Sequence, residues 1–446
     1  TTVSVAPAAD KETLPVALAR LLERAAPGAE GAGHGALRRA ALDRFRERGL
    51  PTTRDEDWRF TSVAPLARTA FVPAEASKAT SDREIDPYRL PSAVEMVFVD
   101  GLYAPSLSRV GAEGVAVASL RECLVGQGAT VEPHLGRLLG ETASPFADLN
   151  TALHEDGAVV EVAPRSAVAL PIHLLFFSTG KAPVARFPRV LVLARAGSQA
   201  TLVETYVGTG PAASLTCAVT EIVVEENAVL RRYKLQDEAE AAFHLSTLAA
   251  RLARNGRFHD LSVSLGAALS RHDLTVTLDA EGAETSLDGL FFADGDRHTD
   301  THTLIDHARP HGTSRQIYKG IVDGRGRGVF TGRVLVRKDA QKTDAAQSNK
   351  NLLLSREALV HGAPQLEILA DDVKCRHGAT TGQLDEAAVF YLRSRGLSEA
   401  AARGLLTAAF AGDLIGRIAL PALRERVSTR LLSRLPGAAQ VREAAL

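Results

Sequence analysis

A cysteine and a histidine two residues apart are the side chains of this sequence best suited to chemistry. Cys375 and His377 lie in the run 371–378, which reads Asp-Asp-Val-Lys-Cys-Arg-His-Gly. If this run is an extended strand, both side chains point to the same face, roughly 6–7 Å apart along the strand. A thiolate and an imidazole at that separation can both reach one metal ion or one cluster. Spacing alone leaves a simpler interpretation open, in which Cys375 is a small core residue and His377 its polar neighbour.

Two protein ligands are too few for an iron–sulfur cluster of the cubane type, which is normally held by four. Any cluster at Cys375 and His377 would therefore be shared with another chain. The other two cysteines, Cys123 and Cys217, have no ligand-type neighbours at a useful spacing. We expect both of them to be buried packing residues.

A second group of candidate ligands consists of His298, His302, His307 and His311. On a helix, His298 and His302 could bind zinc together. The residues around them favour turns and strands, and on a strand these two histidines lie about 13 Å apart. We therefore expect surface or ladder histidines, and a stand-alone metal-binding protein is the alternative.

The composition is that of an ordinary globular protein. The 446 residues are 45% hydrophobic and 24% charged, with a formal net charge of −1, so the charge favours neither a nucleic acid nor an anionic membrane as partner. Three cysteines without a Cys-x-x-Cys pair make a poor disulfide framework and indicate a reducing compartment. No signal-peptide pattern is visible in residues 1–12, and the apolar run 167–177 is too short to cross a bilayer. These observations predict a cytoplasmic protein.

The common catalytic motifs are missing from the sequence. There is no phosphate-binding Gly-x-x-x-x-Gly-Lys-Ser/Thr loop, which predicts that this chain has no ATP site of that type. There is no Gly-x-Ser-x-Gly elbow and no His-Glu-x-x-His helix. We therefore expect a protein that is not an enzyme. A polysaccharide-acting β-helix enzyme would need a carboxylate cluster on one groove, and none is evident.

The elements that must position Cys375 and His377 begin with an N-terminal, mainly helical domain at 1–155. Apolar residues recur at helical spacing in 14–22 and again in 36–48, where Gly49 and Pro51 punctuate the end of the second helix. A short strand is expected at 95–99.

A β-rich core is predicted for residues 156–382. Short runs of β-branched and aliphatic residues follow one another there, separated by turn residues. The turn residues Gly197, Asn227, Asn255 and Gly282 are 30, 28 and 27 residues apart. This loose period favours strand–turn units stacked as a parallel β-helix. A large β-sandwich is the alternative that the spacing leaves open.

Residues 383–446 return to a helical pattern. An apolar stripe in 384–392 follows Asp385, Ser398 is placed to cap the next helix, and Pro421 suits the first turn of the last helix. These helices either cap the end of the β-helix or offer an apolar surface to a partner. The candidate partner-binding residues are Tyr391, Leu392, Leu405 and Phe410.

Three separated motifs, in order, resemble those of the SufB/SufD family of iron–sulfur cluster assembly scaffolds. The N-terminal one is Gly-Leu-Pro at 49–51 with Glu-Asp-Trp-Arg-Phe-Thr at 56–61. The central one is Ser-Arg-Gln-Ile-Tyr-Lys-Gly at 314–320, with Phe-Thr-Gly at 330–332 and Ala-Gln-Lys-Thr-Asp at 340–344. The C-terminal one is the run 371–380, continuing to Phe-Tyr-Leu-Arg-Ser-Arg-Gly at 390–396. The resemblance covers about 49–412, most of the chain.

Within the family, the sequence is similar to the SufD type. SufB-type chains typically read Glu-His-Glu-Ala-Thr where this chain has Arg-His-Gly-Ala-Thr at 376–380, and they carry a functional cysteine at the position of Leu392. This chain thus lacks the thiol that the resemblance would assign as the main sulfur acceptor. The resemblance assigns His377 as a ligand of iron or of the cluster, and Cys375 matches the neighbouring cysteine of the SufD type.

The resemblance implies a right-handed parallel β-helix between helical terminal domains. It also implies a heterodimer with a SufB-like paralogue and two SufC ATPases docked on the C-terminal helices. The iron or iron–sulfur cluster would be transient and shared with the paralogue. A homodimeric scaffold that works without a paralogue is the closest alternative.

Overall fold

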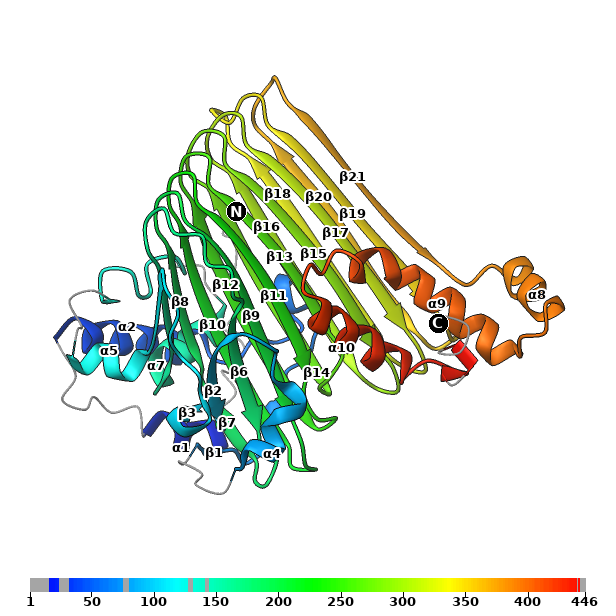
Figure 1. Ribbon diagram of the computed structural model, residues 1–446, viewed down its shortest axis with the longest axis horizontal. Coiled ribbons are helices and arrows are strands. Elements are labelled where there is room, and N and C mark those ends of the chain that lie inside the picture. The colour runs from blue at the N-terminus through cyan, green and yellow to red at the C-terminus, as the bar shows by residue number, and fades with distance from the viewer. Residues whose placement is uncertain are drawn as a thin grey trace, which may run out of the picture.

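The computed structural model describes residues 16–23, 32–74, 80–126, 131–140, 144–438 and 440–441. Most of the strands are parallel and form one stack, and helices lie on either side of this stack (Figure 1). Within these residues, no helix is both long enough and apolar enough to cross a membrane.

The stack is a parallel β-helix of about eight turns, which confirms the predicted fold class. Its longer strands alternate inward and outward side chains, so each buries one face in the interior. The strands are β1 (Val72–Pro73), β2 (Val94–Val99), β3 (Leu102–Tyr103), β4 (Val115–Ser119), β5 (Gly157–Val162), β6 (Ile172–Ser178), β7 (Val184–Arg186), β8 (Arg189–Ala194), β9 (Gln199–Gly208), β10 (Ser214–Val224), β11 (Val229–Asp237), β12 (Ala242–Leu252), β13 (Arg257–Ser264), β14 (Leu269–Leu278), β15 (Glu284–Ala293), β16 (His298–His307), β17 (Thr313–Val322), β18 (Arg327–Val336), β19 (Asp344–Leu353), β20 (Leu359–Ile368) and β21 (Lys374–Gly382).

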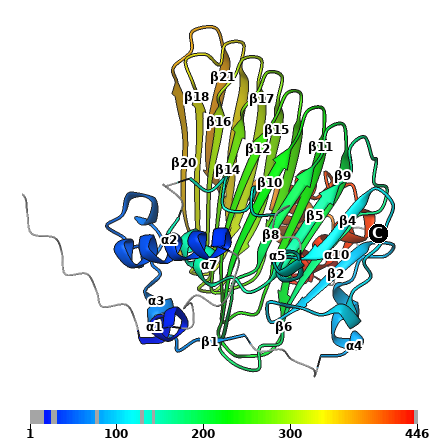
Figure 2. The same ribbon diagram turned by 90° about the vertical axis from the view of Figure 1, so that its left-hand side faces the viewer.

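Successive strands go alternately to two sheets. The first sheet has the order β20-β18-β16-β14-β12-β10-β8-β5-β4, with β7 and β1 joined at its side. The second sheet has the order β21-β19-β17-β15-β13-β11-β9-β6-β2-β3. Each turn of the chain therefore adds one strand to each sheet, and β20 and β21 are the last strands of the two sheets (Figures 1 and 2).

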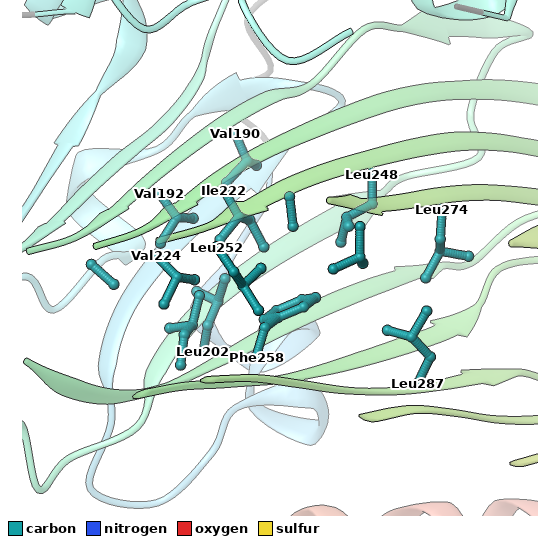
Figure 3. Close-up of a cluster of buried hydrophobic side chains, with 14 of the residues drawn as sticks. Val190, Val192, Leu202, Ile222, Val224, Leu248, Leu252, Phe258, Leu274 and Leu287 are labelled. Carbon is teal, nitrogen blue, oxygen red and sulfur yellow. The ribbon is translucent and has the colours of Figure 1, made fainter. Parts of the chain in front are cut away.

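Apolar side chains from both sheets meet in the interior of the β-helix. Figure 3 shows valines, isoleucine and leucines of the first sheet facing Leu202, Phe258 and Leu287 of the second. All three of these residues are completely buried. Burying one such side chain contributes roughly 1.5–3 kcal/mol, so the stacked rows are the main stabilising feature of the core.

The turns at one side of the stack contain a row of residues with positive φ. Gly197 (69°), Asn227 (58°), Asn255 (52°) and Gly282 (72°) occupy equivalent places, and the Asn255 side chain donates to that of Asn227 at 3.1 Å. Glycine and asparagine tolerate this left-handed conformation best. The turn residues that indicated a repeat in the sequence are therefore those that the backbone requires.

Most of the N-terminal helices cover the outer face of the first sheet (Figure 2), whereas the short helix Asp82–Ile85 packs against the second. They are α1 (Val16–Glu23), α2 (Ala32–Arg48), α3 (Ala64–Ala67), α4 (Asp82–Ile85), α5 (Leu120–Gly126) and α7 (Pro145–Leu153), with short 3-10 turns at Glu56–Trp58, Asp86–Tyr88 and Pro105–Leu107. Trp58 of the first 3-10 turn is buried, and the Arg271 guanidinium on β14 stacks over its ring at 3.8 Å from the centroid. The N-terminal motif thus fastens this region to the β-helix.

Two of the C-terminal helices, Glu399–Ile415 and Pro421–Leu432, lie along the second sheet on the opposite side, and the third, Glu386–Ser394, projects away from it (Figure 1). They are α8 (Glu386–Ser394), α9 (Glu399–Ile415) and α10 (Pro421–Leu432). The Asp385 side chain accepts from the backbone of Ala387 at the start of α8, and Ser398 caps α9 as predicted. Leu423, Val427 and Leu431 of α10 are buried against the sheet.

The two sheets extend further toward the N-terminus than the strand pattern suggested. The predicted strand at 95–99 is β2, which pairs with β6 of the second sheet, and β4 pairs with β5 of the first. The second helix begins at Ala32 rather than at Ala36. The domain limits at 155 and 382 stay predictions.

Candidate functional site

Cys375 and His377 both lie on β21, the last strand of the second sheet (Figure 1). The register pairs Cys375 with Ala345 and His377 with Gln347, two buried residues of the inward row of β19. The two candidate ligands therefore share the inward face, on the strand where the interior of the β-helix opens to solvent.

The two side chains differ in their exposure. Cys375 is half-buried and packs against the apolar core, and this burial raises the pKa of its thiol. A thiol with a raised pKa stays protonated at neutral pH, so it would become a ligand only when a metal displaces its proton. The side chain of His377 is exposed, so it is open to a ligand without rearrangement of the core.

The donor set on this chain is incomplete for a cluster. In the described part of the chain, no group of three or more His, Cys, Asp or Glu side chains is arranged to hold a metal ion. Imidazole and thiolate are donors that suit iron. A metal centre at β21 would thus take its remaining ligands from outside these residues.

The end of the β-helix presents unpaired strand edges. Among the described strands, none pairs with the outer edge of β20 or β21. The Lys374 amide donates at 2.8 Å to the carbonyl of Thr343, the residue just before β19. Amides alternate in direction along a strand, so those of Cys375, His377 and Ala379 point to the free edge. On β20 the same alternation places Pro364, which has no N–H, with its nitrogen toward the free edge.

Apolar side chains lie beside these edges. Leu359 and Ile368 at the two ends of β20 and Leu369 just beyond it are among the exposed large hydrophobic residues of the chain. Phe60 of the N-terminal motif is also exposed and stacks on His361 of β20, with ring centroids 4.0 Å apart. An open strand edge with apolar neighbours is typical of a surface that pairs with another chain.

The four candidate partner-binding residues of the C-terminal helices have different surroundings. Tyr391 is 57% exposed on α8, whereas Leu392 and Leu405 are partly buried. Phe410 lies at the joint between α9 and the β-helix, where the Lys319 amine donates to its carbonyl at 2.7 Å and lies over its ring. The structure thus brings Phe410 into an internal contact and leaves Tyr391, with its neighbour Phe390, at the surface.

The histidine group is spread over β16 and the following turn. His298 contacts the Thr61 hydroxyl, His302 lies 3.1 Å from an Asp300 oxygen, and His307 points inward to Ser314. His311 occupies a turn with positive φ. The group is distributed along a strand, as expected for ladder histidines.

The remaining cysteines lie far from β21. Cys217 on β10 is buried beneath the N-terminal helices, and burial raises the pKa of its thiol well above the usual range. Cys123 on α5 is partly buried against a small apolar cluster. The packing role predicted for Cys217 is confirmed, and that of Cys123 is confirmed in part.

The sequence analysis did not identify the buried amide side chains on the two strands next to β21 in the second sheet. Gln316, Gln347, Asn349 and Asn351 are buried on the inward rows of β17 and β19. Their alternation with outward residues in 344–353 is the signal that could have found them.

Fold and site together define a class of protein: a parallel β-helix that carries a cysteine and a histidine on one face of its last strand, at an open end. Comparison with known families is consistent with this class. Residues 176–410 match the SufBD core domain of the SUF iron–sulfur cluster assembly system, and residues 33–174 match the SufBD N-terminal region. The chain belongs to the SufBD family.

Individual relatives agree with this assignment. The chain is 36% identical over 409 residues to an iron–sulfur cluster assembly SufBD family protein of Synechocystis, which covers 87% of this chain and 88% of the relative. It is 32% identical over 416 residues to the iron–sulfur cluster assembly protein SufD of Escherichia coli, covering 92% and 96%. It is 30% identical over 390 residues to the chloroplastic protein ABCI7 of Arabidopsis thaliana, covering 84% and 81%. The chain is thus a SufD homologue.

Proposed function

We propose that this chain is a SufD-type scaffold subunit that pairs with a SufB-like paralogue, docks SufC ATPases and has no catalytic activity of its own. His377, with Cys375, contributes ligands to iron or to a nascent cluster at the interface. The observation that carries the proposal is the position of both donors on β21, the last strand of the second sheet, whose outer edge pairs with none of the described strands. A donor pair at that edge would be completed by the same chain that pairs with the strand.

Strand addition is the proposed mode of pairing. The free amides of β21 and the apolar side chains near β20 support it, because a partner strand would satisfy the amides and cover the apolar surface. Pairing would also cover the exposed His377, so iron bound there would be shielded from solvent.

The C-terminal helices are the proposed docking site of the ATPases. Phe390 and Tyr391 of α8 are 71% and 57% exposed, a large apolar surface for neighbouring residues on one helix. Helix α9 is tied to β17, where the Lys319 amine contacts Asp413 at 2.5 Å, and the Arg417 guanidinium reaches Asp288 of β15 at 2.9 Å.

These ties support a mechanical coupling between the ATPases and β21. Lys319 on β17 is the register partner of Lys350 on β19, which in turn pairs with Thr380 on β21. In our proposal, ATP-driven dimerisation of the ATPases strains α8 and α9, and the strain reaches the interface through these strands. The shift would expose the site for entry of iron or release of the cluster.

The pairing can be tested at the free edge of β21. Replacing Ala379 with proline removes one free-edge amide and leaves the hydrogen bonds to β19 intact, in the arrangement that Pro364 already adopts on β20. We expect Ala379→Pro to weaken binding of the paralogue at least about tenfold, measured by co-purification and titration, whereas Ala379→Ser binds normally. Equal binding by both variants, with both folded, would contradict pairing through this edge.

A homodimeric scaffold is the second candidate, because the same open edge could pair with a second copy in a symmetric dimer. Light scattering of the chain alone and after mixing with the paralogue separates the two. The proposal predicts that mixed dimers replace any homodimer. A homodimer that persists in the presence of excess paralogue would favour the second candidate.

A further inference from the structure

A chain of buried amide groups ends beside His377. Gln347 donates from Nε2 to Oε1 of Gln316 at 2.5 Å, and Gln316 donates from Nε2 to the Thr303 hydroxyl at 2.7 Å. Each amide donates from its NH₂ group to a residue on an earlier strand, so both hydrogen bonds run in the same direction, away from β21. The last acceptor of this chain of amides, Oε1 of Gln347, is buried and has no hydrogen-bond partner among the described residues.

The position of the Gln347 amide is fixed by its surroundings. Gly332 of β18 approaches so closely that a Cβ there would lie 2.1 Å from Nε2 of Gln347. The two neighbouring amides do not compete for the open acceptor, because Asn351 donates to Asn349 at 2.7 Å and Asn349 donates to the Tyr318 carbonyl at 3.3 Å. The open acceptor of Gln347 is thus left for a donor from the next strand.

The next strand offers His377. Gln347 and His377 are register partners in a parallel pair, so their inward side chains are neighbours about 4.8 Å apart along the sheet. A neutral imidazole has one N–H donor and one nitrogen with a lone pair. An acceptor beside the ring selects the tautomer whose N–H points to it and leaves the other nitrogen free.

We infer that Gln347 is the positioning residue of the site. Its amide oxygen accepts the ring N–H of His377, which fixes the tautomer and directs the second ring nitrogen to the open end, where iron would bind. The inference rests on the proposed role of His377 as an iron ligand and adds the residue that orients it. Metal-binding histidines generally donate their other N–H to such an acceptor, and losing it typically weakens metal binding about 10–100-fold.

The test compares variants of the metal-free full-length chain, with histidine labelled by ¹⁵N. The His377 ring signals are assigned by their loss in His377→Gln, and long-range ¹⁵N–¹H correlations report the tautomer. We expect one dominant tautomer in the parent chain and in Gln347→Glu, which retains an acceptor oxygen. In Gln347→Leu we expect a mixture of tautomers, and Ser348→Ala, on the outward face of the same strand, should match the parent chain.

A second measurement is iron binding by the anaerobic complex with the paralogue and the ATPase. We expect Gln347→Leu to weaken iron binding about 10–100-fold and Gln347→Glu to restore most of it. An unchanged tautomer of His377 in a folded Gln347→Leu chain would overturn the inference. So would a hydrogen bond of the opposite direction, in which the Gln347 NH₂ group donates to the His377 ring. If His377→Ala abolishes iron binding while Gln347→Leu has no effect, the positioning role fails and the proposed site stands. If His377→Ala itself has no effect, the proposed site fails.

Discussion

The guanidinium of Arg232 donates from Nε to Oε1 of Glu204 at 2.6 Å inside the β-helix. The same side chain donates from its Nη1 to Asp260 at 2.6 Å, and all three residues are buried. These contacts connect three consecutive strands of the second sheet, β9, β11 and β13. The interior of the β-helix therefore contains a buried charged triad as well as the apolar cluster shown in Figure 3.

Removing the cation of this triad should be strongly destabilising. Arg232→Met leaves the buried carboxyl groups of Glu204 and Asp260 without their partner, and we expect a loss of about 3–5 kcal/mol in the free energy of unfolding, measured by urea denaturation. The control is Arg325→Met, which removes an ion pair with Asp296 at the exposed surface and should leave stability close to the parent value. Similar effects of the two substitutions would contradict the assigned role of Arg232.

Acid should destabilise the protein through His307. Burial lowers the pKa of His307 from its usual 6.5 to about 4, because the charged ring would lose its hydration. The unfolded chain thus binds a proton near pH 6.5 that the folded chain accepts only near pH 4, so stability from this group is complete above pH 6.5 and is lost as the pH falls to 4. The loss should be about 3 kcal/mol.

The measurement is the free energy of unfolding of the parent chain and of His307→Gln between neutral pH and pH 4. The variant keeps a polar group near Ser314 and should show a flatter dependence on pH. Parallel curves for the two proteins would show that His307 is not the titrating group.

Gly289 of β15 lies beside the inward ring of Tyr318 on β17, where a larger side chain would collide with the ring. A Cβ on Gly289 would lie 2.1 Å from Cε1 of Tyr318, whereas a Cβ on Gly378 of β21 would meet nothing within 4 Å. We expect Gly289→Ala to cost about 1–3 kcal/mol and lower the melting temperature, and Gly378→Ala to change it little. A stable Gly289→Ala variant would mean that the Tyr318 ring can move aside.

The surface of α8 gives a prediction about the ATPase. Phe390→Asp should weaken docking of the ATPase at least about tenfold, because it places a charge in the proposed apolar contact. Val125→Asp on α5 is the matched control, since Val125 is also an exposed apolar residue of a helix, at 87%. Both variants should retain the stability of the parent chain. Normal docking of the ATPase to the Phe390→Asp variant would show that the exposed surface of α8 is not the docking site.

The sequence predicted those parts of the fold that depend on local chemistry. Turn residues such as Asn227 and Gly282 need a left-handed backbone, and capping residues such as Ser398 start a helix, so both could be found without knowledge of contacts. Inward residues such as Arg232 could not, because a charged residue in a strand normally indicates the solvent face. Only the register of β9, β11 and β13 brings its partners together.

The candidate site shows the same division. The spacing of Cys375 and His377 predicted a shared face on a strand, and the register of β21 agrees. The place of that strand at the open end, and the presence of Gln347 beside it, depend on pairing between residues 30 positions apart in sequence. Pattern within one strand does not contain that information.

The central claim is that His377 holds iron or a nascent cluster at the interface, and iron content tests it most directly. We would measure iron and acid-labile sulfide in the anaerobically purified complex of this chain, the SufB-like paralogue and the ATPase, after confirming equal assembly. The account predicts a large loss of both in His377→Ala and normal content in His361→Ala, a change on the other terminal strand. Unchanged iron and sulfide in His377→Ala would contradict it and leave the cluster to the paralogue alone.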